Sequence, residues 1–63
     1  MQLRRLRIER ALSQDDMERM TGVAQATISA LEHSKRPARP STIRKLAAAL
    51  GVEPRELIKA EEE

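Results

Sequence analysis

The chain has 63 residues and contains no phenylalanine, tyrosine, tryptophan or cysteine. A core must therefore be built from Leu, Ile, Val, Met and Ala, which suits packed helices better than a sandwich of sheets. Because a chain of about 60 residues buries only roughly 60% of its unfolded surface, we expect one small domain over residues 1–63 without a deep cavity. The missing side chains also exclude disulfides, thiolate metal sites, cysteine nucleophiles and aromatic platforms that stack nucleobases.

Charge is distributed unevenly along the chain, although the formal net charge is only +2. Residues 1–52 carry ten basic and five acidic side chains, a balance of +5, whereas residues 53–63 carry two basic and five acidic, a balance of −3. A basic body favours a polyanionic partner, but a charged surface is equally typical of a stable soluble domain. No apolar run approaches the roughly 20 residues that span a bilayer, so we expect a soluble protein with no membrane partner.

Glycine and proline divide the chain into five predicted helices, at about residues 2–10, 14–21, 25–32, 41–50 and 54–60. The second helix has the clearest start, because Ser13 and Asp16 have the spacing of a capping box. Gly22 and Gly51 are suited to end the second and fourth helices in the left-handed conformation. Residues 61–63 are expected to fray as a solvated acidic tail.

Apolar residues at helical spacing predict the core. Ile8 lies off the buried face of the first helix, and we interpret it as partly covered surface, with an interface as the alternative. We expect replacement of Arg10 by alanine to have only a mild effect on the stability of the domain. The predicted core residues are Leu3, Leu6, Leu12, Met17, Met20, Ile28, Leu31, Ile43, Leu46, Ala47, Leu50, Leu57 and Ile58.

The third predicted helix has an unusual outward face. Ile28 and Leu31 point one way at 100° per residue, and small or amide side chains point the other. The outward residues are Gln25, Ala26, Ser29 and Ala30. Because solvated helix faces usually carry Lys and Glu, this face is suited to lying close against another surface.

Four motifs at helix-turn-helix spacing carry a resemblance to a known family: LSQ at 12–14, TGV at 21–23, ATIS at 26–29 and LAAALGV at 46–52. Together they make residues 3–58 resemble the phage-repressor/Cro (XRE-type, lambda-repressor-like) helix-turn-helix domain. The resemblance implies an all-α, five-helix fold with the helix-turn-helix at about 14–32. It also implies a transcriptional regulator, most simply a repressor, that binds double-stranded DNA sequence-specifically as a homodimer on a pseudo-palindromic site in a bacterial or phage-infected cytoplasm.

The same resemblance assigns roles to individual residues. Base-reading positions correspond to Gln25, Ala26, Ser29 and Ala30, of which Gln25 suits a bidentate contact with adenine. Phosphate-contacting positions correspond to Gln14, Thr27, Lys35, Arg36, Arg39 and Arg7. We expect the start of the second helix and the loop and helix start at residues 35–42 to hold the flanking phosphates. Arg7 also matches one half of an ion pair with Glu32, and we interpret this pair as mainly structural.

Three positions depart from the family pattern. Ala24 stands where a Ser or Thr usually caps the third helix, Glu18 stands where a small residue packs, and Ser34 replaces a loop glycine. These departures bear on docking rather than on the fold.

Two other functions are weighed against DNA binding. An antitoxin or adaptor that binds mainly a protein would use Ile8 or the apolar residues of the last helix. An enzyme is poorly supported, because the sequence offers no nucleophile–base pair, no phosphate-binding glycine loop and no metal set beside the single histidine, His33. No cofactor is expected.

Overall fold

Five helices form the fold in the computed structural model, which describes residues 1–35 and 37–59. They are α1 (Leu3–Glu9), α2 (Gln14–Thr21), α3 (Gln25–Glu32), α4 (Pro40–Leu50) and α5 (Pro54–Ile58). The described residues contain no strand, so the predicted all-α class is confirmed. The expected tail at 61–63 lies outside the described residues.

Local sequence signals set the helix ends. Ser13 Oγ accepts a hydrogen bond from the Asp16 backbone N–H, and Asp16 accepts one from the Ser13 N–H, both at 2.9 Å, so the predicted capping box is present. Gly22 and Gly51 end α2 and α4 with φ of 77° and 71°, as expected for left-handed caps. Helix α4 begins at Pro40, one residue earlier than predicted, because proline is well suited to a first helical position.

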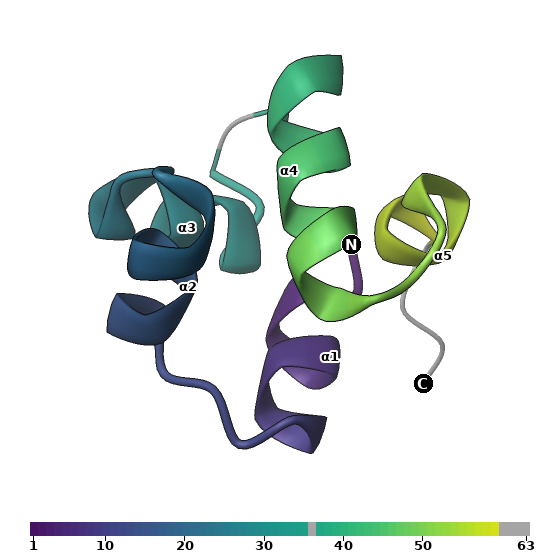
Figure 1. Ribbon diagram of the computed structural model, residues 1–63. Helices are drawn as coiled ribbons and strands as arrows, with labels where there is room; N and C mark the ends of the chain where they lie inside the picture. The colour runs from purple at the N-terminus through teal and green to yellow at the C-terminus, as the bar shows by residue number, and fades with distance from the viewer. Residues whose placement is uncertain (36, 60–63) are drawn as a thin grey trace.

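Figure 1 shows α4 running through the middle of the molecule, with α2 and α3 on one side and α5 on the other. The most extensive helix contacts join α2 to α3 and α4 to α5, and α1 contacts α3, α4 and α5. The shared core consists of Leu3, Leu6, Met17, Ile28, Leu31, Leu46, Ala47, Leu50 and Leu57. Leu12 and Ile43 pack at its edge as partly buried residues.

Two predicted core residues lie on the surface instead. Met20 and Ile58 are each 53% exposed. The buried stripe of α2 is centred on Met17, and Met20 lies beyond its edge. Helix α5 has only five residues, so Leu57 alone fills the core and Ile58, about 100° further round, faces outward. Ile8, which was expected off the buried face, is 49% exposed.

Arg10 has a larger structural role than the sequence indicates. Its Nε donates to the Leu50 carbonyl at 2.7 Å, and its Nη1 donates to the Leu6 carbonyl at 2.9 Å. These contacts join the C-terminal ends of α1 and α4, where helix carbonyls lack partners within the helix. The sequence predicts only a mild effect of replacing Arg10 by alanine, and these two hydrogen bonds favour a larger one.

The three departures from the family pattern have different local consequences. Ser34 has a φ of 56°, a left-handed conformation that the replaced glycine would adopt without strain, and Ala11 adopts a φ of 55° that the sequence did not indicate. Ala24 provides no side-chain cap for α3. Glu18 is half-buried, and no buried side-chain nitrogen or oxygen in the described part of the chain lacks a hydrogen bond.

Candidate nucleic-acid interface

The α2–turn–α3 unit holds α3 in a fixed orientation. Thr21 Oγ1 donates to the Met17 carbonyl at 2.6 Å and accepts from the Val23 N–H at 3.1 Å, which braces the turn around Gly22. Ile28 and Leu31, at 0% and 2% exposure, attach α3 to the core. One side of α3 is thereby anchored, and its other side faces outward.

The outward side of α3 contains the four residues predicted to read bases. Gln25 and Ala26, in the first turn, are exposed, whereas Ser29 and Ala30 are half-buried. None of the four carries a charge, and three of them are no larger than serine. Such a face allows a partner to approach the helix closely, with the Gln25 amide as the largest polar group.

Glu32, the last residue of α3, binds side chains from both α1 and α2. Arg7 donates to it twice, from Nε to Oε2 at 2.6 Å and from Nη2 to Oε1 at 3.1 Å, so the expected ion pair is present. Gln14 Nε2, at the start of α2, donates to the same Oε1 at 3.1 Å. The amide of Gln14, expected to contact phosphate, is thus partly engaged within the protein.

Burial and hydrogen bonding have opposite effects on the pKa of the Glu32 carboxylate. Burial alone would raise the pKa of Glu32, but the hydrogen bonds from Arg7 and Gln14, with the positive charges of Arg7 and Arg4, hold it below its ordinary value. The hydrogen bond to Glu32 likewise raises the pKa of Arg7. Both groups stay charged at neutral pH.

The loop between α3 and α4 carries exposed basic side chains. Lys35 and Arg39 are exposed, and Arg36 lies outside the described residues. A hollow of about 280 Å³ opens between α3 and the start of α4. Its lining residues are Thr27, Leu31, Pro37, Ala38, Arg39 and Thr42. Two expected phosphate contacts, Thr27 and Arg39, therefore lie together.

The start of α4 borders this hollow through Arg39 and Thr42. Arg39 occupies the N-cap position without a side-chain cap, and Pro40 follows at the first helical position. The next N–H groups, those of Ser41 and Thr42, have no acceptor within the helix. Helix N-termini of this kind favour anions.

Residues 3–57 match the helix-turn-helix family. The chain belongs to the XRE/lambda-repressor-like helix-turn-helix family. Searches of curated proteins and of solved structures gave no match. Members of this family are DNA-binding transcription regulators and are not typically enzymes.

One candidate contact of this helix-turn-helix domain was predicted only as part of a segment. Thr42 is the last residue of the segment 35–42 expected to hold phosphates, and it lines the hollow beside Thr27. The available signal was Pro40, which marks a helix start and places Thr42 in the first turn.

In residues 1–35 and 37–59, no three His, Asp or Glu side chains gather where they could hold a metal ion. None of the helices described is long and apolar enough to cross a membrane.

Proposed function

We propose that this helix-turn-helix domain is a sequence-specific repressor that binds double-stranded DNA with α3 in the major groove. The observation that carries the proposal is the uncharged outward face of α3, which is followed in the chain by the exposed cations Lys35 and Arg39. An α-helix fits the major groove, where each base pair presents a distinct pattern of donors and acceptors.

The outward residues of α3 divide into one amide and three small side chains. Gln25 is proposed to make a bidentate contact with adenine N6 and N7. Ala26 and Ala30 would contact thymine methyl groups or allow α3 to lie deep in the groove, and Ser29 can bond either base edge.

Phosphates on either side of the groove are proposed to bind Gln14, Thr27, Lys35, Arg36 and Arg39. Arg7 is a secondary candidate, because three of its five N–H groups donate to Glu32 and Leu12 and two remain. Phosphate contacts position the protein, and base contacts give it specificity.

A homodimer on a pseudo-palindromic site is the proposed assembly, because two domains double both base readout and phosphate contacts. The proposed setting is the cytoplasm of a bacterium or of a phage-infected cell, where the DNA is accessible.

A second candidate function is supported by exposed apolar side chains. Ile8 on α1 and Ile58 on α5 are 49% and 53% exposed. They would suit an antitoxin or adaptor whose main partner is a protein, and the same surfaces would suit a second copy of this chain.

Selection from a random duplex pool tests the proposal. The expected result is an enriched half-site, repeated with two-fold symmetry at a spacing near one helical turn, and affinity that falls steeply with salt. The absence of any salt-dependent duplex binding at about 50 mM salt would overturn DNA binding. An enriched single half-site would retain DNA binding and overturn the homodimer.

A further inference from the structure

The net positive charge of residues 1–52 comes from the loop before α4 and from α4 itself. Residues 1–32 carry five basic and five acidic side chains, whereas residues 33–52 carry five basic and no acidic ones. The basic residues of this second segment are Lys35, Arg36, Arg39, Arg44 and Lys45. The first three are proposed phosphate contacts, and the two on α4 have no role in the proposed function.

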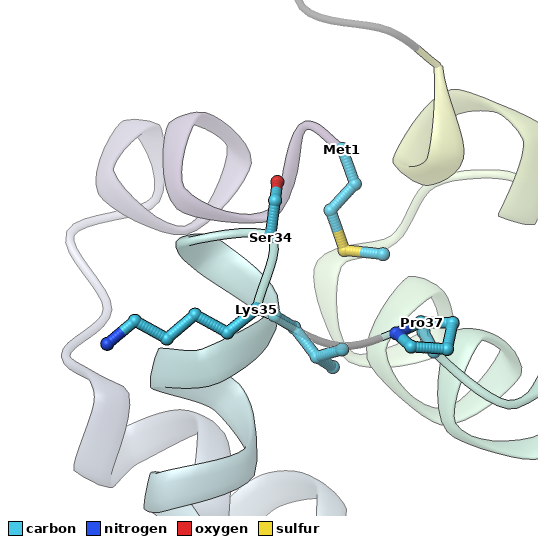
Figure 2. A pocket seen from close by; sticks show the side chains of 6 residues that line it. Met1, Ser34, Lys35 and Pro37 are labelled. Carbon is cyan, nitrogen blue, oxygen red and sulfur yellow. The ribbon is translucent and has the colours of Figure 1, made fainter.

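The basic side chains of the two segments also differ in their partners. On α1 and α2, Arg5, Arg7 and Arg19 each lie within 2.9 Å of a carboxylate oxygen. In residues 1–35 and 37–59, no basic side chain that follows α3 has such a partner. Figure 2 shows one of them, Lys35, extending away from Met1 and Pro37, with which it lines a second hollow. Because cations without acidic partners repel one another in the folded chain, this concentration of charge favours a polyanionic partner.

The charge on α4 does not stabilise the helix either. Acidic residues in the first turn and basic residues in the last turn would complement the helix dipole, and α4 has neither. Arg44 and Lys45 lie instead in the middle of the helix, and both are exposed. Their contribution is therefore sought in binding.

The two cations of α4 lie at different angles to the hollow between α3 and α4, which Thr42 lines. Successive residues turn by about 100°, so Lys45 lies about 60° from Thr42 around the helix axis and Arg44 about 160° from it. Lys45 is about 4.5 Å further along the axis than Thr42. Since helix side chains tilt toward the N-terminus, the surface that Lys45 covers lies over the turn containing Ser41 and Thr42.

We propose that Lys45 is a further phosphate contact of this domain, binding the phosphate next to the one held at Thr27, Arg39 and Thr42. The inference rests on the proposed DNA-binding function, and it extends the bound DNA backbone one turn along α4. A lysine ammonium group binds phosphate as a point charge, so its contact needs no fixed geometry. Arg44 has the same charge but lies away from the hollow, so it makes no such contact.

The test compares Lys45→Gln with Arg44→Gln in the 63-residue chain. Each variant removes one positive charge from an exposed position on α4, so the two change the net charge equally. Lys45→Arg keeps the charge and is the conservative variant. Affinity for the selected site and for random duplex is measured between about 50 and 200 mM salt, at a temperature at which thermal scans show every variant folded.

Lys45→Gln is expected to weaken binding about three- to tenfold at low salt, for selected and random duplexes alike. It should also reduce, by about 1, the steepness with which the logarithm of affinity falls against the logarithm of salt concentration. Arg44→Gln should weaken binding less than about twofold without changing the steepness, because a charge outside the contact is screened. Lys45→Arg should retain the parent values.

Two results of this comparison would overturn the proposal. Equal losses in Lys45→Gln and Arg44→Gln would indicate a long-range effect of net charge rather than a contact at Lys45. An unchanged salt dependence in Lys45→Gln would show that no phosphate contact was removed.

Acetylation of the parent chain separates failure of this inference from failure of the proposed function. The chain has three lysines, Lys35, Lys45 and Lys59, and all are exposed. Saturating duplex is expected to slow acetylation of Lys35 and Lys45 several-fold and to leave Lys59, which follows α5, unchanged. Protection of Lys35 without Lys45 would overturn this inference and retain DNA binding. A parent that binds no duplex and gains no protection would overturn the proposed function and the inference with it.

Discussion

Arg7 and Glu32 form a bidentate ion pair, with Nε 2.6 Å from Oε2 and Nη2 3.1 Å from Oε1. The Glu32 side chain is 1% exposed and that of Arg7 12% exposed, so both charges are largely removed from water. Gln14 donates to the same carboxylate. The Glu32 side chain, at the end of α3, therefore binds α1 through Arg7 and α2 through Gln14. Buried pairs of this kind gain little net energy but are costly to break, so the contact fixes the position of α3.

Arg7→Ala should destabilise the domain by about 3–5 kcal/mol, because it leaves the buried Glu32 carboxylate without its main partner. Urea denaturation followed by circular dichroism measures the loss. The double variant Arg7→Leu/Glu32→Leu is the control and should regain most of the stability, since it removes both buried charges. A single variant within about 0.5 kcal/mol of the parent would contradict a structural role for the pair.

Stability should fall in acid as Glu32 becomes protonated. Its folded pKa lies below the ordinary value of 4.5, so the folded state binds the proton less readily than the unfolded chain does. The associated stabilisation is therefore complete above about pH 4.5 and is lost as pH falls through the folded pKa. Hydrogen bonds from the backbone and side chain of Ser13 lower the pKa of Asp16 below 3.8, which adds to the loss in the same direction.

Thermal midpoints recorded from pH 7 to pH 2 test this dependence. Glu32→Gln should be less stable at pH 7 and show a shallower decline between pH 5 and 3 than the parent. Glu56→Gln, at an exposed position on α5, is the matched control and should follow the parent profile. Parallel profiles for Glu32→Gln and the parent would contradict the assignment.

Much of the fold follows from local signals in the sequence. Ser13, Gly22, Gly51 and Pro54 mark helix ends through capping and backbone conformation, which depend on a few neighbouring residues. Leu46 and its neighbours predict a buried stripe through spacing alone. The exposure of Met20 and Ile58 was not predictable in this way, because it depends on how wide a contact each helix makes with the others.

The candidate site was only partly predictable for a similar reason. The composition of the α3 face is a local property, and family motifs identified its role. The link from Gln14 to Glu32 spans 18 positions in sequence, and that from Arg10 to Leu50 spans 40. Contacts at such separations depend on the packing of the helices, which periodicity does not specify.

Arg10→Ala should cost about 1–3 kcal/mol, because a charged guanidinium donates to the carbonyls of Leu6 and Leu50 at two helix ends. The measurement is the midpoint shift in urea at neutral pH. Arg19→Ala provides the comparison, since the Arg19 side chain is 75% exposed and pairs with Asp15 one turn away. That variant should change stability by less than about 0.5 kcal/mol, and similar losses in the two variants would contradict the capping role of Arg10.

Ser34→Gly should stabilise the domain by about 1 kcal/mol, because Ser34 is held at a φ of 56° that glycine adopts without strain. Thermal unfolding monitored by calorimetry gives the change. Gly51→Ala is the reverse experiment, as Gly51 has a φ of 71° and no other atom within 4 Å of an added Cβ. It should destabilise through backbone conformation alone, and a lower midpoint for Ser34→Gly would show that the turn is not strained.

Gln25→Ala should abolish discrimination at one base pair, whereas Lys35→Ala should weaken binding to all duplexes alike. Gln25 is exposed in the first turn of α3 and is the only outward residue there able to make a bidentate contact, worth about 1–3 kcal/mol against the wrong base. The exposed Lys35 can offer a single charge to phosphate. Its loss should therefore also reduce, by about 1, the steepness with which the logarithm of affinity falls against the logarithm of salt concentration. Binding of both variants to the selected site, to single-base variants of it and to random duplex supplies the comparison. If Gln25→Ala lost affinity equally for selected and random duplexes, Gln25 would be a phosphate contact or a structural residue, and the proposed orientation of α3 in the groove would be wrong.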